Sequence, residues 1–490
     1  MRLALQAPTT TPAPLFAWTT DRNPVNGDSG LKPVTRRKFI ASTGAGLLLP
    51  ALPRLACAQD IAIEAKAAAV QLVPPEYGKT DVWAYDGSVP GTSLRLRQGE
   101  RLRRTFINQL DQPSTIHWHG IRLENAMDGA AGFTQEAVPP GGRFLYDFIA
   151  KDAGTYWYHP HRNTLEQVSR GLAGPLIVEE TEAPDVDDDL TLLIQDWRLD
   201  PDAQIVSDFA NLHDMAHAGR IGNHLTVNGD QAWVRTAQTG QRLRLRIINT
   251  ASDRILRLGG EGLAGYVMAL DGMPLRQPEA FREIVLAPAQ RADIFADIAA
   301  QPGETAHLTS IERQGTFSLA AFPVKGSTAK IARSAPGPLP PNPVATPRLE
   351  EARKLELVME GGAMGQMASA RMADGKTRSM RELIDQGMIW ALNGTAGMTD
   401  QPLADLGLGE NVRVRLVNRT AWPHAMHLHG HHFQEISDGT LGPLRDTILM
   451  MPREEREIGF VADNPGRWMF HCHMLSHQAA GMMSWVNVTS

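Results

Sequence analysis

Three stretches of the chain repeat one pattern, a glycine turn followed by strict alternation of polar and apolar residues. They occupy residues 99–108, 240–249 and 409–418. A period of two sends successive side chains to opposite faces, so each stretch is predicted to be a half-buried β-strand. A second repeated piece follows each of them, at 140–148, 288–297 and 452–460. Because both pieces keep their order in all three copies, the sequence predicts three homologous β domains.

Turn-forming residues indicate how these domains are organised. The 44 glycines and 33 prolines fall where sheets would turn, and three Greek-key β-sandwiches, an all-β fold, are expected. An acidic run at 185–189 separates the first two copies, and a proline-rich stretch at 336–347 separates the second from the third. The predicted boundaries are 59–182 for domain one, 183–328 for domain two, 329–350 for an extended linker and 351–490 for domain three.

The first 58 residues are predicted to be a signal peptide. Arg36 and Arg37 precede a short apolar run that ends at Leu49, and Ala56 and Ala58 offer the small residues of a cleavage site. This resembles a twin-arginine export signal, so we expect the twin-arginine machinery to deliver the protein to the periplasm. The alternative is a chance pair of arginines before a short helix. No apolar run approaches the ~18 residues of a membrane span, so we expect no transmembrane anchor.

Composition narrows the classes of partner. The chain is 42% hydrophobic and 21% charged, and its net charge of −6 argues against a nucleic acid held by bulk electrostatics. Two cysteines are too few for a disulfide scaffold or a four-cysteine metal site. Removal of the signal peptide leaves only Cys472, and a lone thiol in an oxidising compartment is vulnerable unless a metal binds it.

Half of the 16 histidines gather in four short His-x-His clusters, two in domain one and two in domain three. The eight residues are His117, His119, His159, His161, His427, His429, His471 and His473. Corresponding clusters lie 310 and 312 residues apart, which makes them equivalent positions of one fold. On a strand, residues i and i+2 share a face about 6.5–7 Å apart. A single pair is shared with zinc hydrolases and buried structural histidines, but four matched pairs indicate a cluster of metal ions at a domain interface.

The strand that carries Cys472 predicts a second, different site. With His471 and His473 on one face, Cys472 points to the other, and His424, His477 and Met482 complete a two-imidazole, thiolate and thioether set. That set is typical of blue-copper electron-transfer sites and favours copper over zinc. Met483 is the alternative thioether. Electrons can then pass from Cys472 to the histidine-bound metal ions through a few covalent bonds.

In their order along the chain, these motifs resemble those of the multicopper oxidases, which include laccases and bacterial cuprous oxidases, over all three domains. The resemblance implies cupredoxin-like domains, four copper ions per chain, and oxidation of a one-electron reductant coupled to reduction of O₂ to water. It implies a type 1 copper at His424, Cys472, His477 and Met482, a type 2 copper at His117 and His427, and a type 3 pair at His119, His159, His161, His429, His471 and His473. We expect a monomer. The remaining histidines are interpreted as surface or structural: His213, His217, His224, His307, His431 and His432.

Three acidic or amide positions bear on proton transfer. By the same resemblance, Asp128 relays protons near the cluster, a sensible role because water formation consumes protons; the alternative is a turn residue before Gly129. The family often places a glutamate after the last type 1 histidine, whereas this chain has Gln478, which cannot titrate. Asp446 is either a hydrogen-bond partner of a type 1 imidazole or a strand-end carboxylate.

The substrate is less defined, with Cu(I) and phenols as the two candidates. Seven methionines between 359 and 398 lie where cuprous oxidases carry a methionine-rich insertion: Met359, Met364, Met367, Met372, Met380, Met388 and Met398. They hold Cu(I) as soft ligands or fill an ordinary core. Against metal oxidation, Thr420 and Trp422 replace the Asp and Met of cuprous oxidases. Trp422 either lines the path by which an aromatic substrate approaches His424 or has only a packing role.

Three other classes of protein are alternatives to the oxidase. A copper nitrite reductase is disfavoured because it would normally have two such domains and no histidine at the position of His473. A metal-storage protein would not need Cys472 flanked by two histidines. A non-catalytic copper-binding or cell-envelope relative would lack copper ligands, and here every one is present.

Overall fold

A computed structural model describes residues 61–329 and 333–490 of the chain, so the predicted signal peptide lies outside the described residues. Among those residues, no helix has the length and apolar character needed to cross a membrane. Strands dominate, and the helices are short. The helices are α1 (Thr164–Ser169), α2 (Leu212–Ala216), α3 (Met380–Ile384) and α4 (Leu475–Ala479), with 3₁₀ turns η1 (Pro75–Tyr77), η2 (Asn125–Met127) and η3 (Leu349–Glu351).

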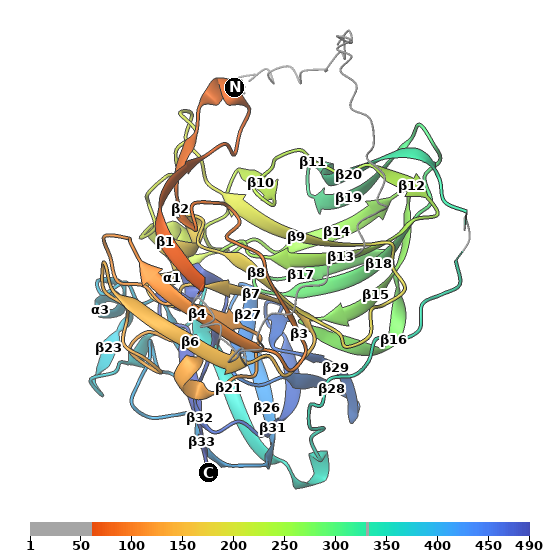
Figure 1. The fold of residues 1–490 in the computed structure, drawn as a ribbon. Helices are drawn as coiled ribbons and strands as arrows, with labels where there is room; N and C mark the ends of the chain where they lie inside the picture. The colour runs from red at the N-terminus through yellow and green to blue at the C-terminus, as the bar shows by residue number, and fades with distance from the viewer. Residues whose placement is uncertain (1–60, 330–332) are drawn as a thin grey trace, which may run out of the picture. The chain divides into compact units, whose positions relative to one another are not determined.

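The strands form three pairs of sheets that follow one another along the chain (Figure 1). In the first sandwich, one sheet has the order β2 (Thr80–Tyr85), β1 (Ile61–Val70), β4 (Arg101–Asn108), β6 (Arg143–Ile149) and the other β3 (Leu94–Arg97), β8 (Gly174–Glu179), β7 (Gly154–His159), β5 (His117–His119). In the second, one sheet has the order β10 (His224–Val227), β9 (Asp188–Trp197), β13 (Arg242–Asn249), β18 (Arg291–Ile298), β15 (Leu263–Leu270), β16 (Met273–Phe281). Its other sheet has the order β11 (Trp233–Val234), β20 (Gly315–Ser327), β19 (Thr305–Glu312), β14 (Leu256–Glu261), β17 (Glu283–Leu286), with β12 (Ala237–Thr239) also on β20.

The third sandwich follows a stretch without helix or strand at 333–348. One sheet has the order β24 (Trp390–Leu392), β21 (Arg353–Gly361), β26 (Glu410–Asn418), β31 (Glu455–Ala462), β28 (Phe433–Ser437), β29 (Thr440–Arg445). The other has the order β25 (Ala404–Gly407), β33 (Met483–Thr489), β32 (Gly466–Cys472), β27 (His424–Leu428), β30 (Thr447–Met450). A separate hairpin of β22 (Ser369–Arg371) and β23 (Thr377–Ser379) interrupts it between β21 and β24.

The two repeated sequence pieces pair with each other in every sandwich. Strands β4, β13 and β26 carry the first piece, and their antiparallel partners β6, β18 and β31 carry the second. The asparagine that ends each first piece is buried, and its side-chain amide donates to a backbone carbonyl just before the partner strand. These bonds run from Asn108 to Val138, Asn249 to Leu286 and Asn418 to Met451, each at 2.9 Å. The repeat therefore encodes one strand pair and its closing hydrogen bond, three times.

The alternation predicts a half-exposed strand correctly for β4 and wrongly for β13. In β4, Leu102 and Phe106 are buried while Arg101 and Arg103 are exposed. In β13 every residue is buried, arginines included. The first sandwich covers the polar face of β13, and that cover is a tertiary contact that the alternation cannot reveal.

Ion pairs make the burial of the β13 arginines possible. Arg244 donates to Asp293 at 2.5 Å and to Glu180 at 2.7 Å, and the exposed fraction of these three side chains is 0–5%. Asp293 also accepts a 2.6 Å hydrogen bond from the hydroxyl of Thr155 on β7. Because Glu180 and Thr155 come from the first sandwich's part of the chain, this network joins the first and second sandwiches.

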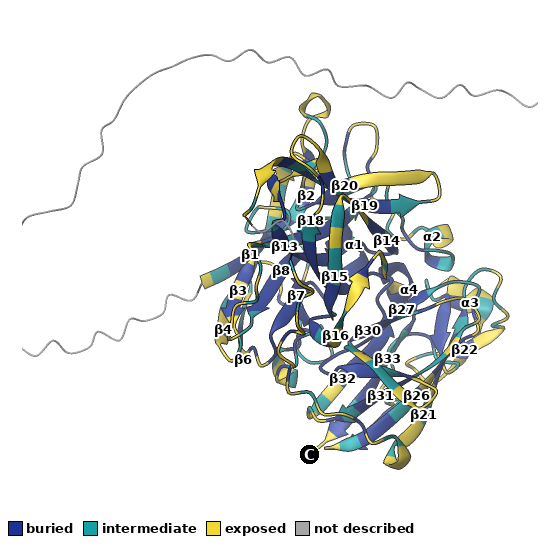
Figure 2. Cartoon of the chain, turned by 90° about the vertical axis from the view of Figure 1, so that its right-hand side faces the viewer, coloured by how far each residue is buried: buried dark blue, intermediate teal, exposed yellow. Residues whose placement is uncertain are grey.

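The buried apolar side chains form two main cores. One continuous core runs through the first and third sandwiches, from Trp118 and Phe148 to Trp468 and Cys472, and a separate core fills the second. Figure 2 shows buried residues concentrated in the strands and exposed residues in the connecting loops. The first and third sandwiches therefore share an apolar seam, although more than two hundred residues separate their first strands.

We predict that Arg244→Met lowers the free energy of unfolding of the metal-free protein by about 3–5 kcal/mol. The substitution leaves the carboxylates of Glu180 and Asp293 buried without the positive charge that Arg244 supplies. Arg257→Met is the matched control, since its pair with Glu283 is 55% and 48% exposed. That control should cost less than about 1 kcal/mol. Urea titration of both variants measures the difference, and equal losses would contradict a special role for the buried network.

Candidate metal centres

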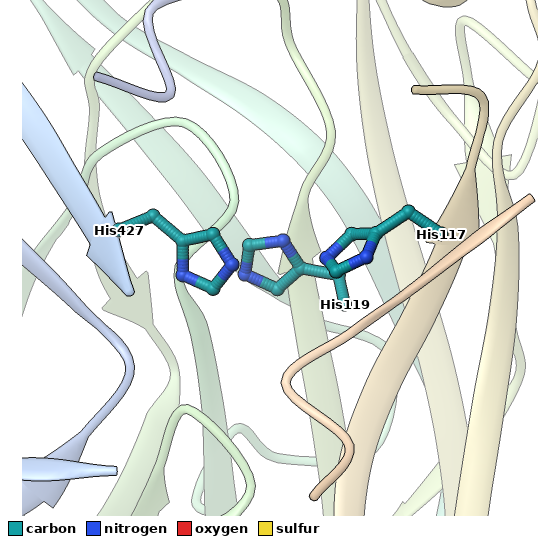
Figure 3. Close-up of side chains that lie close together, drawn as sticks. All are labelled: His117, His119 and His427. Atoms are coloured by element: carbon teal, nitrogen blue, oxygen red, sulfur yellow. The ribbon is translucent and has the colours of Figure 1, made fainter. Parts of the chain in front are cut away.

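The sheets bring the eight clustered histidines, called here the histidine cluster, to the seam between the first and third sandwiches. In the first sandwich β5 pairs with β7, and His117 lies opposite His159. In the third, β27 pairs with β32, and His427 lies opposite His471. The two sandwiches thus present the same pairing of His-x-His strands to each other. Figure 3 shows His117 and His119 pointing from β5 towards His427 on β27.

The imidazoles divide into two triads and a facing pair. In each triad the candidate ligand atoms lie within 4.8 Å of one another, and all side chains are buried. The triads are His119, His159 and His473, and His161, His429 and His471. His117 and His427 remain, and both lie within the same reach of His119. Each triad therefore takes ligands from both sandwiches, so neither sandwich can form the cluster alone.

Asp128 holds one imidazole from each side of the seam. Its backbone carbonyl lies 2.8 Å from Nδ1 of His117, and its carboxylate oxygens lie 3.0 and 3.1 Å from Nδ1 of His429. It also directly follows η2 as its capping residue, so the turn and the contact with the cluster occur together. Asp128 is buried, with 2% of its surface exposed.

Asp446 of the third sandwich makes the equivalent contacts: its carbonyl contacts a histidine of its own sandwich and its carboxylate a histidine of the first. Its carbonyl lies 2.8 Å from Nδ1 of His427, and its Oδ1 lies 3.2 Å from Nε2 of His119. Burial raises the pKa of Asp446, but the adjacent Arg291 and His119 outweigh it and hold that pKa well below its ordinary value. The hypothesis that Asp446 supports an imidazole of the Cys472 site is wrong, because its carboxylate contacts His119 and Arg291 instead.

The second sandwich contributes no histidine to the cluster but holds Asp446 in place. Arg291, at the start of β18, donates to both carboxylate oxygens of Asp446, at 2.9 and 2.7 Å. The Arg291–Asp446 ion pair lies against Gly120, which has φ +85. A Cβ at Gly120 would lie 2.3 Å from Arg291 Nη2 and 2.6 Å from Asp446 Oδ2. The His-x-His-Gly motif of the first sandwich therefore ends in glycine because an arginine–aspartate pair occupies the space beside it.

Protein oxygens fix one ring nitrogen of most cluster histidines and leave the other directed inward. Six of the eight have such a partner; besides the four bound by Asp128 and Asp446, Nδ1 of His159 and of His471 lie 3.0 and 2.9 Å from the carbonyls of Pro160 and Cys472. Contacts of this kind set the tautomer and ring orientation of metal-ligating histidines.

The nitrogens that face inward fit a metal. Nε2 of His117 and His427 and Nδ1 of His119 are buried without a hydrogen-bond partner among the described residues. An unsatisfied buried polar group costs about 1–3 kcal/mol. Burial, and then the neighbouring imidazoles, lower the pKa values of six of these rings, that of His471 to about 3, so these six are neutral with available lone pairs: His119, His159, His161, His429, His471 and His473. Neutral imidazoles suit copper and other borderline transition metals.

Cys472, His424 and His477 form a separate group, called here the cysteine site. The Sγ atom lies 3.8 Å from Nδ1 of each histidine, and the two Nδ1 atoms lie 3.0 Å apart. Burial raises the pKa of Cys472 to about 12, so a bound metal is needed to hold it as a thiolate. Its sequence neighbours His471 and His473 belong to the two triads of the histidine cluster.

Protein groups also close the outer side of the cysteine site. Nε2 of His424 lies 2.8 Å from the Thr420 hydroxyl, and Nε2 of His477 lies 2.8 Å from the backbone carbonyl of His217. The Trp390 ring packs against both imidazoles, with centroids 5.0 and 4.5 Å away. The sequence alone does not reveal these three contacts: Thr420 only departs from a family pattern, and a backbone carbonyl leaves no sequence signal.

The two candidate thioethers occupy different surroundings. Met482 is fully buried in the same core as Cys472, and its carbonyl accepts a 3.1 Å hydrogen bond from the Cys472 amide. Met483 instead lines a cavity of about 390 Å³, whose wall also includes His161 and Gln478. Nε2 of Gln478 lies 3.5 Å from Nε2 of His161. This cavity reaches the histidine cluster beside His161.

Most of the seven methionines at 359–398 fill apolar cores. Met359 is fully buried in the core of the first and third sandwiches, and four others pack against a small core formed by Ala370, Leu383, Ala391 and Ala396. Those four are Met367, Met372, Met380 and Met388. Met398 lines the cavity beside His161, and Met364 is 72% exposed.

The chain is similar to multicopper oxidases over most of its length. Sequence models described as multicopper oxidase match residues 66–183, 188–322 and 366–490. The multicopper oxidase MmcO of Mycobacterium tuberculosis is 30% identical, over 81% of each chain, and laccase-1 of Botryotinia fuckeliana is 29% identical, over 81% of this chain and 77% of its own. The crystal structure of a multicopper oxidase from Pseudomonas thermotolerans superposes with a TM-score of 0.77 at 33% identity, over 88% of this chain and 99% of that one.

We predict that Asp128→Ala weakens copper binding by about 10–100-fold, because it removes the carboxylate that orients His429. Asp128→Asn keeps an oxygen acceptor and should stay closer to the wild type. Asp111→Ala, an exposed aspartate of the same sandwich, is the control and should bind copper normally. Copper retained in competition with a chelator provides the measurement, and equal retention by all three variants would refute the positioning role of Asp128.

Proposed function

This chain belongs to the multicopper oxidase family, and from that premise we propose that the cysteine site accepts single electrons from a substrate and the histidine cluster delivers them to O₂. Multicopper oxidases are copper enzymes with cupredoxin-like domains that couple four one-electron oxidations to the reduction of O₂ to two water molecules. The chain is accordingly an oxidase with copper as cofactor and with O₂ and a reductant as its reaction partners.

We assign the ligands from the groups that the fold brings together. The type 1 copper is held by His424, Cys472 and His477, with Met482 rather than Met483 as the thioether. The type 2 copper is held by His117 and His427. The type 3 pair is held by the two triads, His119, His159 and His473, and His161, His429 and His471. The burial of Met482 beside Cys472 supports its choice.

The observation that carries the proposal is the position of Cys472 between His471 and His473. Its sulfur lies in the cysteine site, while its two neighbours lie in different triads of the histidine cluster. When bound, copper supplies the one-electron redox steps and the binding of O₂. The chain supplies the connection, because an electron received at Cys472 reaches either triad through the backbone of one residue.

We propose that Asp128 relays protons to the histidine cluster, since its carboxylate lies 3.0 Å from His429 at a buried position. Gln478 cannot titrate, and the residues that line the cavity beside His161 include no carboxylate. That cavity is therefore proposed as the path by which O₂ enters and water leaves, with Asp128 as the proton-handling group on another side of the cluster.

Export, domain boundaries and oligomeric state complete the proposal. The Arg36-Arg37 motif supports export of residues 59–490 to the periplasm by the twin-arginine machinery. We retain domain boundaries of 59–182, 183–328 and 351–490 with a linker at 329–350, which agree within a few residues with the first and last strands of each sandwich. We propose that the enzyme acts as a monomer, because each copper site is assembled within one chain.

The reductant is Cu(I) or a phenol. The packing of Met367, Met372, Met380 and Met388 into a small core supports a structural role for these thioethers. Of the seven methionines at 359–398, only Met364 is largely exposed. The methionine content by itself therefore does not favour Cu(I).

We predict that the copper-loaded protein is blue, bleaches under a reductant without O₂ and regains its colour in air. Cys472→Ser should abolish the colour and the oxidation of both Cu(I) and a phenol, because no thiolate remains at the cysteine site. Absorption spectra and O₂ uptake provide the measurements. Met483→Leu is the control and should remain blue; colour that survives in Cys472→Ser would overturn the assignment.

A further inference from the structure

Neither imidazole of the cysteine site offers its outer nitrogen directly to a reductant. Nε2 of His477 lies 2.8 Å from the backbone carbonyl of His217, and Nε2 of His424 lies 2.8 Å from the hydroxyl of Thr420. That hydroxyl lies 3.0 Å from the backbone carbonyl of Trp422. His217 directly follows α2, so the second sandwich covers one side of the cysteine site. Two hydrogen-bonded routes therefore lead outward from this site, one to His217 and one to Trp422.

Both routes end at residues whose rings contact each other. The His217 ring lies 5.1 Å from the Trp422 ring, with the planes at 65°. The His217 ring is also stacked on the ring of His213, with centroids 4.0 Å apart and planes 12° apart. His213 is exposed, and His217 and Trp422 are half-buried. We call these three residues the aromatic platform.

Hydrogen bonds from two sandwiches hold the backbone of the aromatic platform in place. The side chain of Asn211 caps α2 and accepts from the amide of His213 at 3.0 Å. Ala363 joins the two sides: its carbonyl accepts from the Trp422 indole at 3.0 Å, and its amide donates to the Ala216 carbonyl at 2.8 Å. The platform is therefore fixed relative to the cysteine site across the boundary between the second and third sandwiches.

The geometry of the platform suits a planar ring and not a metal ion. Because the planes of His213 and His217 are nearly parallel, their in-plane lone pairs do not converge on one ion. Nδ1 of His217 is also engaged, 2.7 Å from the carbonyl of His213. Aromatic rings pack on one another in offset-stacked arrangements. Among the described residues no ring other than that of His217 contacts His213, so the outermost ring of the platform can accept another ring.

We propose that a planar aromatic reductant of the phenol class stacks on His213 and passes its electron through the stacked imidazoles to the cysteine site. This inference rests on the proposed function and names its substrate class. From the His217 ring the electron reaches the carbonyl of the same residue through covalent bonds, and then His477 through one hydrogen bond. The reductant contacts no copper ligand.

The reaction balances with O₂ as the only oxidant. Each phenol loses one electron to the cysteine site and one proton to water, and leaves as a phenoxyl radical. Four such events release four electrons and four protons, which reduce one O₂ to two water molecules at the histidine cluster.

The test compares oxidation of 2,6-dimethoxyphenol and of hexacyanoferrate(II) by the copper-loaded enzyme. His213→Ala removes the outermost ring and leaves the His217 carbonyl and the cysteine site in place. The KM for the phenol should rise by about three- to tenfold, the size expected for the loss of one aromatic contact. Hexacyanoferrate(II) has no ring to stack, so its kinetics should stay unchanged, and the variant should remain blue.

Three further variants separate stacking from other roles of the imidazoles. His213→Phe keeps a flat ring without ring nitrogens and should retain a KM for the phenol close to that of the wild type. His213→Ala/His217→Ala also removes the ring that leads to the His217 carbonyl, and it should lower kcat for the phenol by about tenfold or more. His307→Ala, which removes a histidine that bonds Ser318 at 2.8 Å, is the control and should oxidise both reductants normally.

Unchanged phenol kinetics in His213→Ala would overturn the inference. An equal loss in His213→Phe would also overturn it, because the effect would then belong to the ring nitrogens. Parallel losses with hexacyanoferrate(II) would do the same, since they would mark damage to the cysteine site itself. Failure of the proposed function would be seen separately, as a wild-type enzyme that no reductant bleaches.

Discussion

Neutral imidazoles buried between two sandwiches need a partner at both ring nitrogens, and this requirement governs the arrangement of the histidine cluster. Backbone carbonyls and two carboxylates hold one nitrogen of six rings, and the opposite nitrogens face a common space. Among the described residues, Nε2 of His117 and His427 and Nδ1 of His119 have no hydrogen-bond partner. In water these atoms would bond solvent, whereas in this seam a metal is the remaining partner. Copper binding and the joining of the first and third sandwiches are therefore coupled.

The two aspartates carry that coupling across the seam in opposite directions. Asp128 belongs to the first sandwich and orients His429 of the third, while Asp446 belongs to the third and orients His119 of the first. The second sandwich supports this exchange through Arg291, whose two hydrogen bonds fix the Asp446 carboxylate. A domain without copper ligands thereby contributes to the geometry of the cluster, and it also supplies the segment that covers the cysteine site.

The two metal groups differ in their access to the surroundings. Protein groups occupy the outer nitrogens of His424 and His477, so electrons reach the cysteine site through hydrogen bonds and packed rings. The histidine cluster instead adjoins a cavity beside His161. This separation suits an enzyme that collects electrons at one place and exchanges O₂ and water at another, because a reductant excluded from the cluster cannot bypass the intended electron path.

The sequence alone determined the β-sandwich class, the threefold repeat and the candidate ligands, because each depends on local order. Alternation with period two marks strands, and His-Cys-His on one strand forces Cys472 and its neighbours to opposite faces whatever surrounds them. Only the tertiary structure determined which residues come into contact. It decided the partition of the histidines into triads and the contact of Asp446 with His119 and not with the cysteine site. It also decided the burial of the β13 arginines and the hydrogen bond between His217 and His477. These depend on residues brought together from distant parts of the chain, in some cases through backbone carbonyls that every residue possesses. Residue identity therefore predicts the chemistry available, and only the packing of the three sandwiches determines the geometry in which it is used.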